Sequence, residues 1–309
     1  MLNVKNLSFN YSNAPKVLND ISFIAQPGEH LSVIGESGSG KSTLLKLLRG
    51  EYDLDQGEIF WKDKPILGPK FNLVIDYDFM KYVAQEFELM PFISVAENIG
   101  EHLSNFYKKN KAKRVKELME IVQLSEFKDT KVKLLSGGQK QRVALARAMA
   151  KEPEIVLLDE PFSHIDNAQK RPLRRNIFNY LKEKNITCIV ASHDREDVLG
   201  FADRMLVLND RRIVADAMPE TLYQNPRKDL IASFFGEFNR SKILGENEII
   251  YSHQLKKVNN SSLKVTVQKN YFKGSYYLIE TENQQSKTIY FEHKDAIEVG
   301  TQVFLKINK

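Results

Sequence analysis

Residues 35–43, GESGSGKST, constrain the fold of this chain more than any other stretch. An alternating apolar run at 30–34 precedes them and a leucine-rich run follows, so the pattern predicts a strand, a glycine-rich loop and a helix. Glycines let backbone N–H groups turn inward around an anion, while the lysine and serine suit terminal phosphates and Mg²⁺. The stretch therefore predicts a site for the phosphates of a nucleoside triphosphate. The candidate residues are Gly35, Glu36, Ser37, Gly38, Ser39, Gly40, Lys41, Ser42 and Thr43.

Length and composition narrow the class of protein. The chain has 309 residues, of which 42% are hydrophobic, which is enough for one large domain and a smaller one. Its 45 basic and 40 acidic residues are interspersed, and a net charge of +5 argues against nucleic acid as the main partner. Apolar runs are too short to cross a bilayer, the first residues lack a signal-peptide pattern, and the single cysteine, Cys188, excludes an internal disulfide. We expect a cytoplasmic location.

Two acidic residues follow a strand of the buried type. The apolar run 155–158 leads into Asp159 and Glu160, and Pro161 ends it. Beside a phosphate site, Asp159 is expected to hold Mg²⁺ and Glu160 to orient or deprotonate the attacking water. The alternative is a charged strand end without a catalytic role.

Two further strands end in polar residues. The apolar run 187–191 precedes His193, which can donate a hydrogen bond to a γ-phosphate, and the run 81–84 precedes Gln85, whose amide suits Mg²⁺ and water. A structural histidine and a surface glutamine are the alternatives. Strands and helices alternate over the first 235 residues, which predicts an α/β fold: a mainly parallel sheet with helices on both faces, a β-rich insertion and a helical subdomain at about 88–134.

A second helix start carries small polar residues. The segment Ser136, Gly137, Gly138 and Gln139 opens the helical run 140–149, where free N–H groups and the positive end of the helix dipole favour an anion. Taken alone, Ser136 is equally consistent with an ordinary N-cap followed by a tight turn.

In their order and spacing, these motifs resemble the nucleotide-binding subunit of ABC transporters, over residues 1 to about 235. The resemblance implies a P-loop NTPase core, ATP and Mg²⁺ as cofactors, ATP hydrolysis, and two copies that enclose two ATP molecules. Each site would be composite. One copy would contribute Lys41, Ser42, Gln85, Asp159, Glu160 and His193, and the other Ser136, Gly137 and Gly138.

Four more positions take their meaning from this resemblance. Tyr11 falls where the family has its adenine-stacking aromatic, although an aromatic after a strand is also typical of packing. Asp166 would communicate across the dimer. His164 stands where the family usually has a small or neutral polar residue, and Pro172 lies past the first turn of the following helix, where proline removes a hydrogen bond and tends to kink the helix.

The tail, residues 236–309, differs in pattern. Alternating runs at 262–267, 276–280, 288–292 and 302–307 predict a small all-β, OB-like barrel. It resembles the accessory β-domain of importer ATPases for polyamines, ferric iron, sulfate or molybdate, and sugars. Its aromatic residues would also suit stacking on single-stranded nucleic acid, but lysines barely outnumber acids there and, after residue 240, arginine is absent, so we expect no nucleic-acid partner.

We therefore predict the ATP-binding and ATP-hydrolysing subunit of an ABC importer, peripheral on the cytoplasmic face of the cell membrane. The expected partners are a second ATP-binding subunit, forming a homodimer, transmembrane permease subunits and a solute-binding protein. Two alternatives stay open: an exporter ATPase, and a soluble ABC ATPase that acts on the ribosome or on nucleic acid.

Overall fold

The computed structural model describes residues 1–11, 16–72, 75, 77–241 and 248–308, and the chain divides into two compact units, Met1–Pro219 and Glu220–Lys309. The predicted loop at 10–16 lies largely outside the described residues. The predicted domains, 1–235 and 236–309, stay a prediction.

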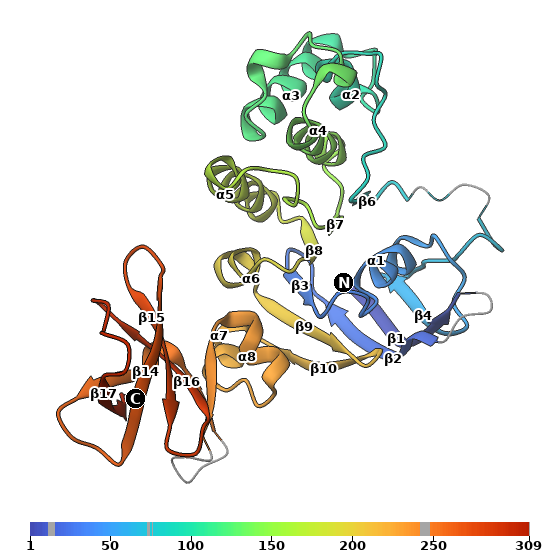
Figure 1. Ribbon diagram of the computed structural model, residues 1–309. Helices are drawn as coiled ribbons and strands as arrows, with labels where there is room; N and C mark the ends of the chain where they lie inside the picture. Colours follow the sequence, from blue (N-terminus) through green and yellow to red (C-terminus); the bar gives the residue numbers. More distant parts are fainter. Residues whose placement is uncertain (12–15, 73–74, 76, 242–247, 309) are drawn as a thin grey trace. The chain divides into compact units, whose positions relative to one another are not determined.

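A six-stranded sheet forms the centre of the first unit (Figure 1). Its order is β10–β9–β3–β8–β7–β6, and all neighbouring strands are parallel except the pair β9–β10. The strands are β3 (His30–Ile34), β6 (Met80–Val83), β7 (Ile155–Asp159), β8 (Thr187–Ala191), β9 (Arg204–Asn209) and β10 (Arg212–Ala217). The prediction of a mainly parallel sheet is confirmed.

The sheet is covered on both faces: its central strands β3, β7 and β8 are buried at every position and mostly apolar, and successive side chains point to opposite faces. In β7, Ile155 and Leu157 pack in the core that contains helix α1 (Lys41–Arg49), while Val156 and Leu158 pack in the core beneath α3, α4 and α5. These three helices are Lys108–Ile121, Gly137–Met149 and Asn167–Glu183. Helix α6, Arg195–Phe201, follows β8 along the chain.

A second, antiparallel sheet shares the α1 core. Its order is β2–β1–β4–β5, with β1 at Leu2–Asn10, β2 at Lys16–Ala25, β4 at Gln56–Trp61 and β5 at Lys64–Pro65. The predicted β-rich insertion is thus present as β4 and β5. Trp61, the only tryptophan, is 2% exposed and donates to Glu154 at 2.9 Å.

The segment between β6 and α4 is helical, as predicted. It contains α2 (Val95–Gly100), α3 and two short 3₁₀ turns, and Ser94 and Glu97 form the capping box expected from the sequence. The strand predicted to reach Gln85 ends earlier, at Val83, and Gln85 lies in the bend that follows. Helix α5 continues through Pro172.

The second unit combines two helices with strands. Helices α7 (Pro219–Gln224) and α8 (Asp229–Phe235) precede a two-stranded ladder of β11 (Phe238–Ser241) and β12 (Glu248–Tyr251). A five-stranded antiparallel sheet follows, in the order β13–β17–β14–β15–β16, and its edge strands β13 and β16 contact each other. The strands are β13 (Leu255–Val258), β14 (Leu263–Phe272), β15 (Tyr277–Asn283), β16 (Thr288–His293) and β17 (Gln302–Ile307).

The all-β character predicted for the tail is confirmed. Its four predicted strands correspond to β14–β17, whereas β11, β12 and β13 were not expected. In the part of the chain that the structure describes, no helix has both the length and the apolar character that a membrane span requires.

Candidate active site

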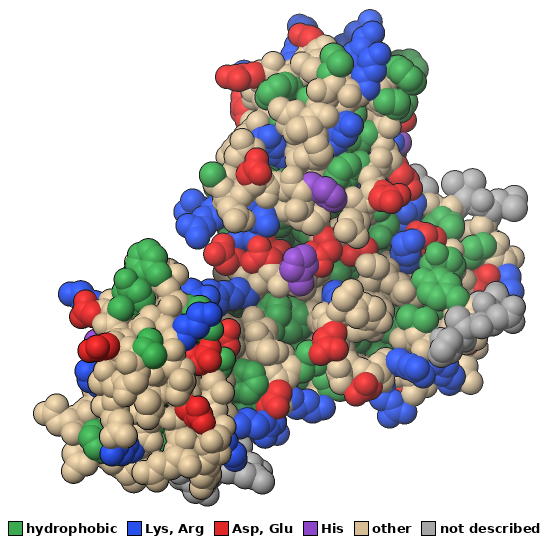
Figure 2. Space-filling view, in the orientation of Figure 1, with side chains coloured by type: hydrophobic (Ala, Val, Ile, Leu, Met, Phe, Trp, Pro, Cys, Tyr) green, Lys and Arg blue, Asp and Glu red, His purple; other side chains and the backbone are tan. Residues whose placement is uncertain are grey.

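The predicted site residues follow strands that are neighbours in the sheet. Strands β3, β8, β7 and β6 are adjacent and parallel, so their carboxyl ends share one edge. The glycine-rich loop follows β3, Asp159 ends β7, and His193 and Gln85 come shortly after β8 and β6. Figure 2 shows acidic side chains gathered in a band across this unit, with histidine beside them. The sheet therefore delivers residues distant in sequence to one edge.

The glycine-rich loop has the shape of an anion cradle. Gly38 and Gly40 have φ angles of +79° and +100°, a region that favours glycine, and Gly40 is the N-cap of α1. Lys41 Nζ donates to the carbonyls of Gly35 and Glu36, at 2.8 and 2.9 Å, so its ammonium lies over the loop. Burial lowers the pKa of Lys41, and nearby carboxylates oppose this effect.

Oxygen atoms suited to Mg²⁺ meet at the start of α1. Ser42 Oγ donates to Asp159 Oδ1 at 3.0 Å, and the Tyr82 hydroxyl donates to Asp159 Oδ2 at 3.2 Å. Within the described residues, no group of three or more His, Cys, Asp or Glu side chains could hold a metal ion. One carboxylate beside a hydroxyl fits Mg²⁺, which takes its other ligands from water and substrate phosphates. Gln85 is exposed beyond β6, and its role stays a prediction.

Glu160 and His193 form a pair at this edge. His193 Nδ1 lies 2.8 Å from the Glu160 carboxylate, with side-chain exposures of 74% and 17% respectively. Glu160 has a φ of +49°, which is uncommon for a residue with a side chain, and its N–H donates to the Ala191 carbonyl at 3.0 Å. A strained backbone held by neighbouring strands is typical of functional sites.

Known proteins are similar to this chain in sequence. A family model described as ABC transporter matches residues 18–163. The chain is 39% identical, over 77% of its length and 67% of the relative's, to the Fe(3+) ions import ATP-binding protein FbpC 2 of Haemophilus influenzae. It is 35% identical to the sulfate/thiosulfate import ATP-binding protein CysA of Pseudomonas syringae pv. tomato, covering 81% of this chain and 77% of that protein.

The chain belongs to the ABC transporter ATP-binding family. Among solved structures, a dimeric ATP-binding cassette in a post-hydrolysis state with ADP and Pi is similar, with a TM-score of 0.63 and 27% identity over 71% of this chain and 98% of that one. The predicted family, fold and ATPase class are confirmed.

In this ABC cassette, the segment 136–139 forms the start of α4. Ser136 Oγ accepts from Gln139 N at 3.3 Å, and Gln139 Oε1 accepts from Ser136 N at 2.9 Å, which completes a capping box. Within the described residues, the hydrogen bonds of these two side chains stay at this helix end and do not reach the phosphate loop. A Cβ on Gly138 would lie 2.7 Å from the His164 carbonyl oxygen, so only glycine fits there without a shift.

Tyr11 and Asp166 are the two remaining residues predicted from the resemblance. The Tyr11 hydroxyl shares a hydrogen bond of 3.0 Å with Thr43 Oγ1, and its ring packs edge-on against Phe9 and Tyr52. Tyr11 is half-buried and lies beside the first turn of α1. Asp166 is the exposed N-cap residue of α5 and makes no side-chain capping bond. Adenine stacking and dimer communication stay predictions for these residues.

Gln141 is a functional candidate that sequence reasoning missed. It is fully buried in α4, its Nε2 donates to the Glu160 carbonyl at 2.9 Å, and its Oε1 accepts from His164 N at 3.1 Å. The amide thus fixes the backbone on which Glu160 sits. The sequence does contain one indication of this role. Gln141 lies four and seven residues before the apolar Leu145 and Ala148, so helical spacing places this polar side chain on the buried face of the helix.

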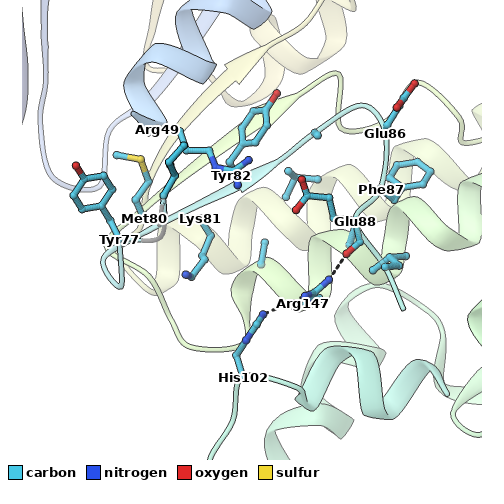
Figure 3. A pocket seen from close by; sticks show the side chains of 16 residues that line it. Arg49, Tyr77, Met80, Lys81, Tyr82, Glu86, Phe87, Glu88, His102 and Arg147 are labelled. Carbon is cyan, nitrogen blue, oxygen red and sulfur yellow. Dashed lines mark hydrogen bonds between the residues drawn. The ribbon is translucent and has the colours of Figure 1, made fainter. Parts of the chain in front are cut away.

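A pocket of about 270 Å³ opens between the end of β6 and helix α4 (Figure 3). Arg147 projects from α4 into its wall, donates to the Glu88 carbonyl, contacts His102 Nε2 at 3.3 Å and pairs with Glu101 at 2.6 Å. Phe87 and Tyr82 also line the pocket. Its wall therefore combines cationic and aromatic groups with the segment that follows Gln85.

Proposed function

We propose that this chain is the ATP-hydrolysing subunit of an ABC importer, in which ATP binding closes a dimer and hydrolysis reopens it. The observation that carries the proposal is the Glu160–His193 pair beside the phosphate loop and the Ser42–Asp159 pair. The family relationship supports it independently.

The side chains at this edge of the sheet have different roles in phosphoryl transfer. Lys41 and the N–H groups of the loop bind the terminal phosphates and stabilise charge that develops on them. Glu160 orients the attacking water and accepts its proton, and His193, held against Glu160, contacts the γ-phosphate. Ser42 and Asp159 would hold Mg²⁺, which when bound neutralises charge on the phosphate oxygens.

The active form is a homodimer in this proposal. The Ser136 end of α4 is exposed, which leaves it accessible to the nucleotide of a second copy, and a similar cassette has been solved as a dimer. Ser136, Gly137 and Gly138 would bind the γ-phosphate held by the partner, and Asp166 would contact that partner. Residues 1–235 would form the ATP-binding domain and residues 236–309 the accessory β-domain.

The pocket beside Gln85 supports a permease partner. A helix end of a membrane permease would fit a pocket whose wall offers Arg147, His102 and the Phe87 ring. The chain would then be peripheral on the cytoplasmic face, with a solute-binding protein on the other side. Both relatives named above are import ATP-binding proteins, which favours import over export or a ribosomal role, but their solutes differ, so the solute is not assigned.

Two measurements on the full chain test the proposal. The purified protein should hydrolyse ATP only with Mg²⁺. A tagged chain, expressed in the organism from which it comes, should co-purify with a multi-spanning membrane protein from detergent-solubilised membranes. Hydrolysis by a persistently soluble pool bound to ribosomes or DNA would overturn the transport role.

A further inference from the structure

Arg174 lies at the centre of a cluster of charged side chains next to His193. Its side chain is 3% exposed and extends from α5 toward the loop between β8 and α6. It pairs with Asp194 at 2.6 Å, with Glu196 at 2.7 Å and with Asp197 at 2.5 Å. The first two contacts are hydrogen bonds, whereas the third is an ion pair without hydrogen-bond geometry.

The acids of this cluster fix both neighbours of His193. Asp197 is 2% exposed and accepts from Ser192 Oγ at 2.5 Å, and Ser192 Oγ in turn accepts from Asp194 N at 3.0 Å. Ser192 N also donates to the Val33 carbonyl at the end of β3. The residues before and after His193 are therefore held, while the His193 imidazole itself is 74% exposed and lies against Glu160.

The same guanidinium contacts the segment that carries Glu160. Arg174 lies over the ring of Phe162, 5.6 Å from its centroid, and Phe162 is buried two positions after Glu160. One side chain thus touches the loops that present both members of the Glu160–His193 pair. Burial raises the pKa of Asp197 to about 6, while the hydrogen bond from Ser192 and the charge of Arg174 oppose this shift and favour the charged carboxylate.

We propose that Arg174 is a positioning residue for hydrolysis: through Asp194, Asp197 and Phe162 it sets the placement of His193 relative to Glu160. The inference rests on the proposed ATPase function. A planar guanidinium bonded to several carboxylates fixes geometry in a way that an ammonium group does not. Loss of this constraint should slow the chemical step more than it weakens ATP binding, because the other proposed phosphate contacts, Lys41 and the N–H groups of the glycine-rich loop, lie on other elements.

The test uses the full chain with Arg174→Lys, which keeps the charge, and Arg174→Met, which removes it. Arg175→Met is the matched control, because Arg175 is exposed on the same helix. Steady-state ATPase assays give kcat and KM, and circular dichroism checks folding. We expect Arg174→Lys to lower kcat by about 10- to 100-fold with KM for MgATP within about twofold. The control should retain the parental values.

A second measurement does not depend on hydrolysis. In the parent, Glu160→Gln should shift the NMR signal of the His193 imidazole, because the two side chains are in contact. In the Arg174→Lys background the same substitution should produce a much smaller shift. An unchanged kcat in folded Arg174→Lys protein, or a full His193 response in that background, overturns the proposal. If the parent protein fails to hydrolyse ATP, the proposed function is wrong. The NMR response of His193 still tests whether Arg174 sets its placement, because that measurement does not require hydrolysis. If Arg174→Met does not fold, Arg174→Lys decides.

Discussion

The imidazole of His164 packs edge-on against the ring of Phe87, with centroids 5.5 Å apart and ring planes at 76°. Phe87 lines the pocket after β6, whereas the His164 N–H bonds to Gln141, whose amide holds the Glu160 carbonyl. A continuous set of contacts therefore joins the pocket to the backbone of Glu160. The unusual histidine at position 164 is thus a packing residue between two loops of the site.

The aromatic pair should contribute measurable coupling energy. We expect the double variant Phe87→Ala/His164→Ala to lose less free energy of unfolding than the two single variants lose in total. The difference, which is the coupling energy of the pair, should be about 0.5–1.5 kcal/mol. Urea unfolding followed by the fluorescence of Trp61 reports on this unit alone, because the only tryptophan lies in it. Phe92→Ala, at a 70% exposed ring, is the control and should show no coupling to His164. Strict additivity of Phe87→Ala and His164→Ala would show that the contact carries no energy.

Adjacent glycines should differ in their tolerance of alanine. Gly138→Ala places a Cβ 2.7 Å from the His164 carbonyl and should lower stability by about 1–3 kcal/mol. Gly137→Ala meets its nearest atom, His164 Cβ, at 3.9 Å, so its stability should match or exceed that of the parent. Thermal unfolding monitored at Trp61 distinguishes them, and equal midpoints for the two variants would contradict the predicted close approach.

Acid should destabilise the first unit through His30. Its imidazole is 2% exposed beside Phe178, and burial, the main cause, lowers its pKa from 6.5 to about 4. The unfolded chain therefore binds this proton more readily, so stability is complete above pH 6.5 and falls as the pH drops toward 4, by about 3 kcal/mol in total. His30→Leu should remove this part of the pH dependence. If the urea midpoints of parent and variant fall in parallel between pH 6.5 and 4, His30 is not the source.

Removal of the proposed general base should separate binding from turnover. Glu160→Gln keeps the side-chain shape but accepts a proton poorly, so kcat should fall by about 10²- to 10⁴-fold while ATP binding persists. Dimers should then accumulate with MgATP, which light scattering on a sizing column detects. Parental hydrolysis by this variant would show that Glu160 does not activate the water.

The sequence predicts the strand ends well because their signals are local. Apolar runs followed by Asp159 and His193 gave the right strands, and parallel pairing then brought these residues to one edge. The contacts that position them were not predictable in this way. Gln141 bonds to the Glu160 carbonyl and Arg174 to Asp194. Both partners lie outside the helix that carries the donor, so spacing within that helix does not indicate them.

In the tail, residues 236–309, too, only elements with a clear local pattern were predicted. Its later strands alternate clearly, but β11 and β13 have only four residues each, too few for alternation to distinguish them from loops. Pro172 was expected to disturb its helix, yet α5 continues past it and buries Leu173 and Ile177, so packing on the sheet outweighs the lost hydrogen bond.

The place of β3 in the sheet affects how the protein is made. This strand, which leads into the phosphate loop, pairs on one side with β8 and on the other with β9, so Leu31 lies opposite Ile189 and Arg204. Both neighbours are synthesised much later than β3. Nearly the whole first unit must therefore be synthesised before β3 can pair with a neighbouring strand. Until then, the nascent chain exposes the apolar side chains of β3. Premature termination before β8 would leave the strand that precedes the phosphate loop without either of its partner strands.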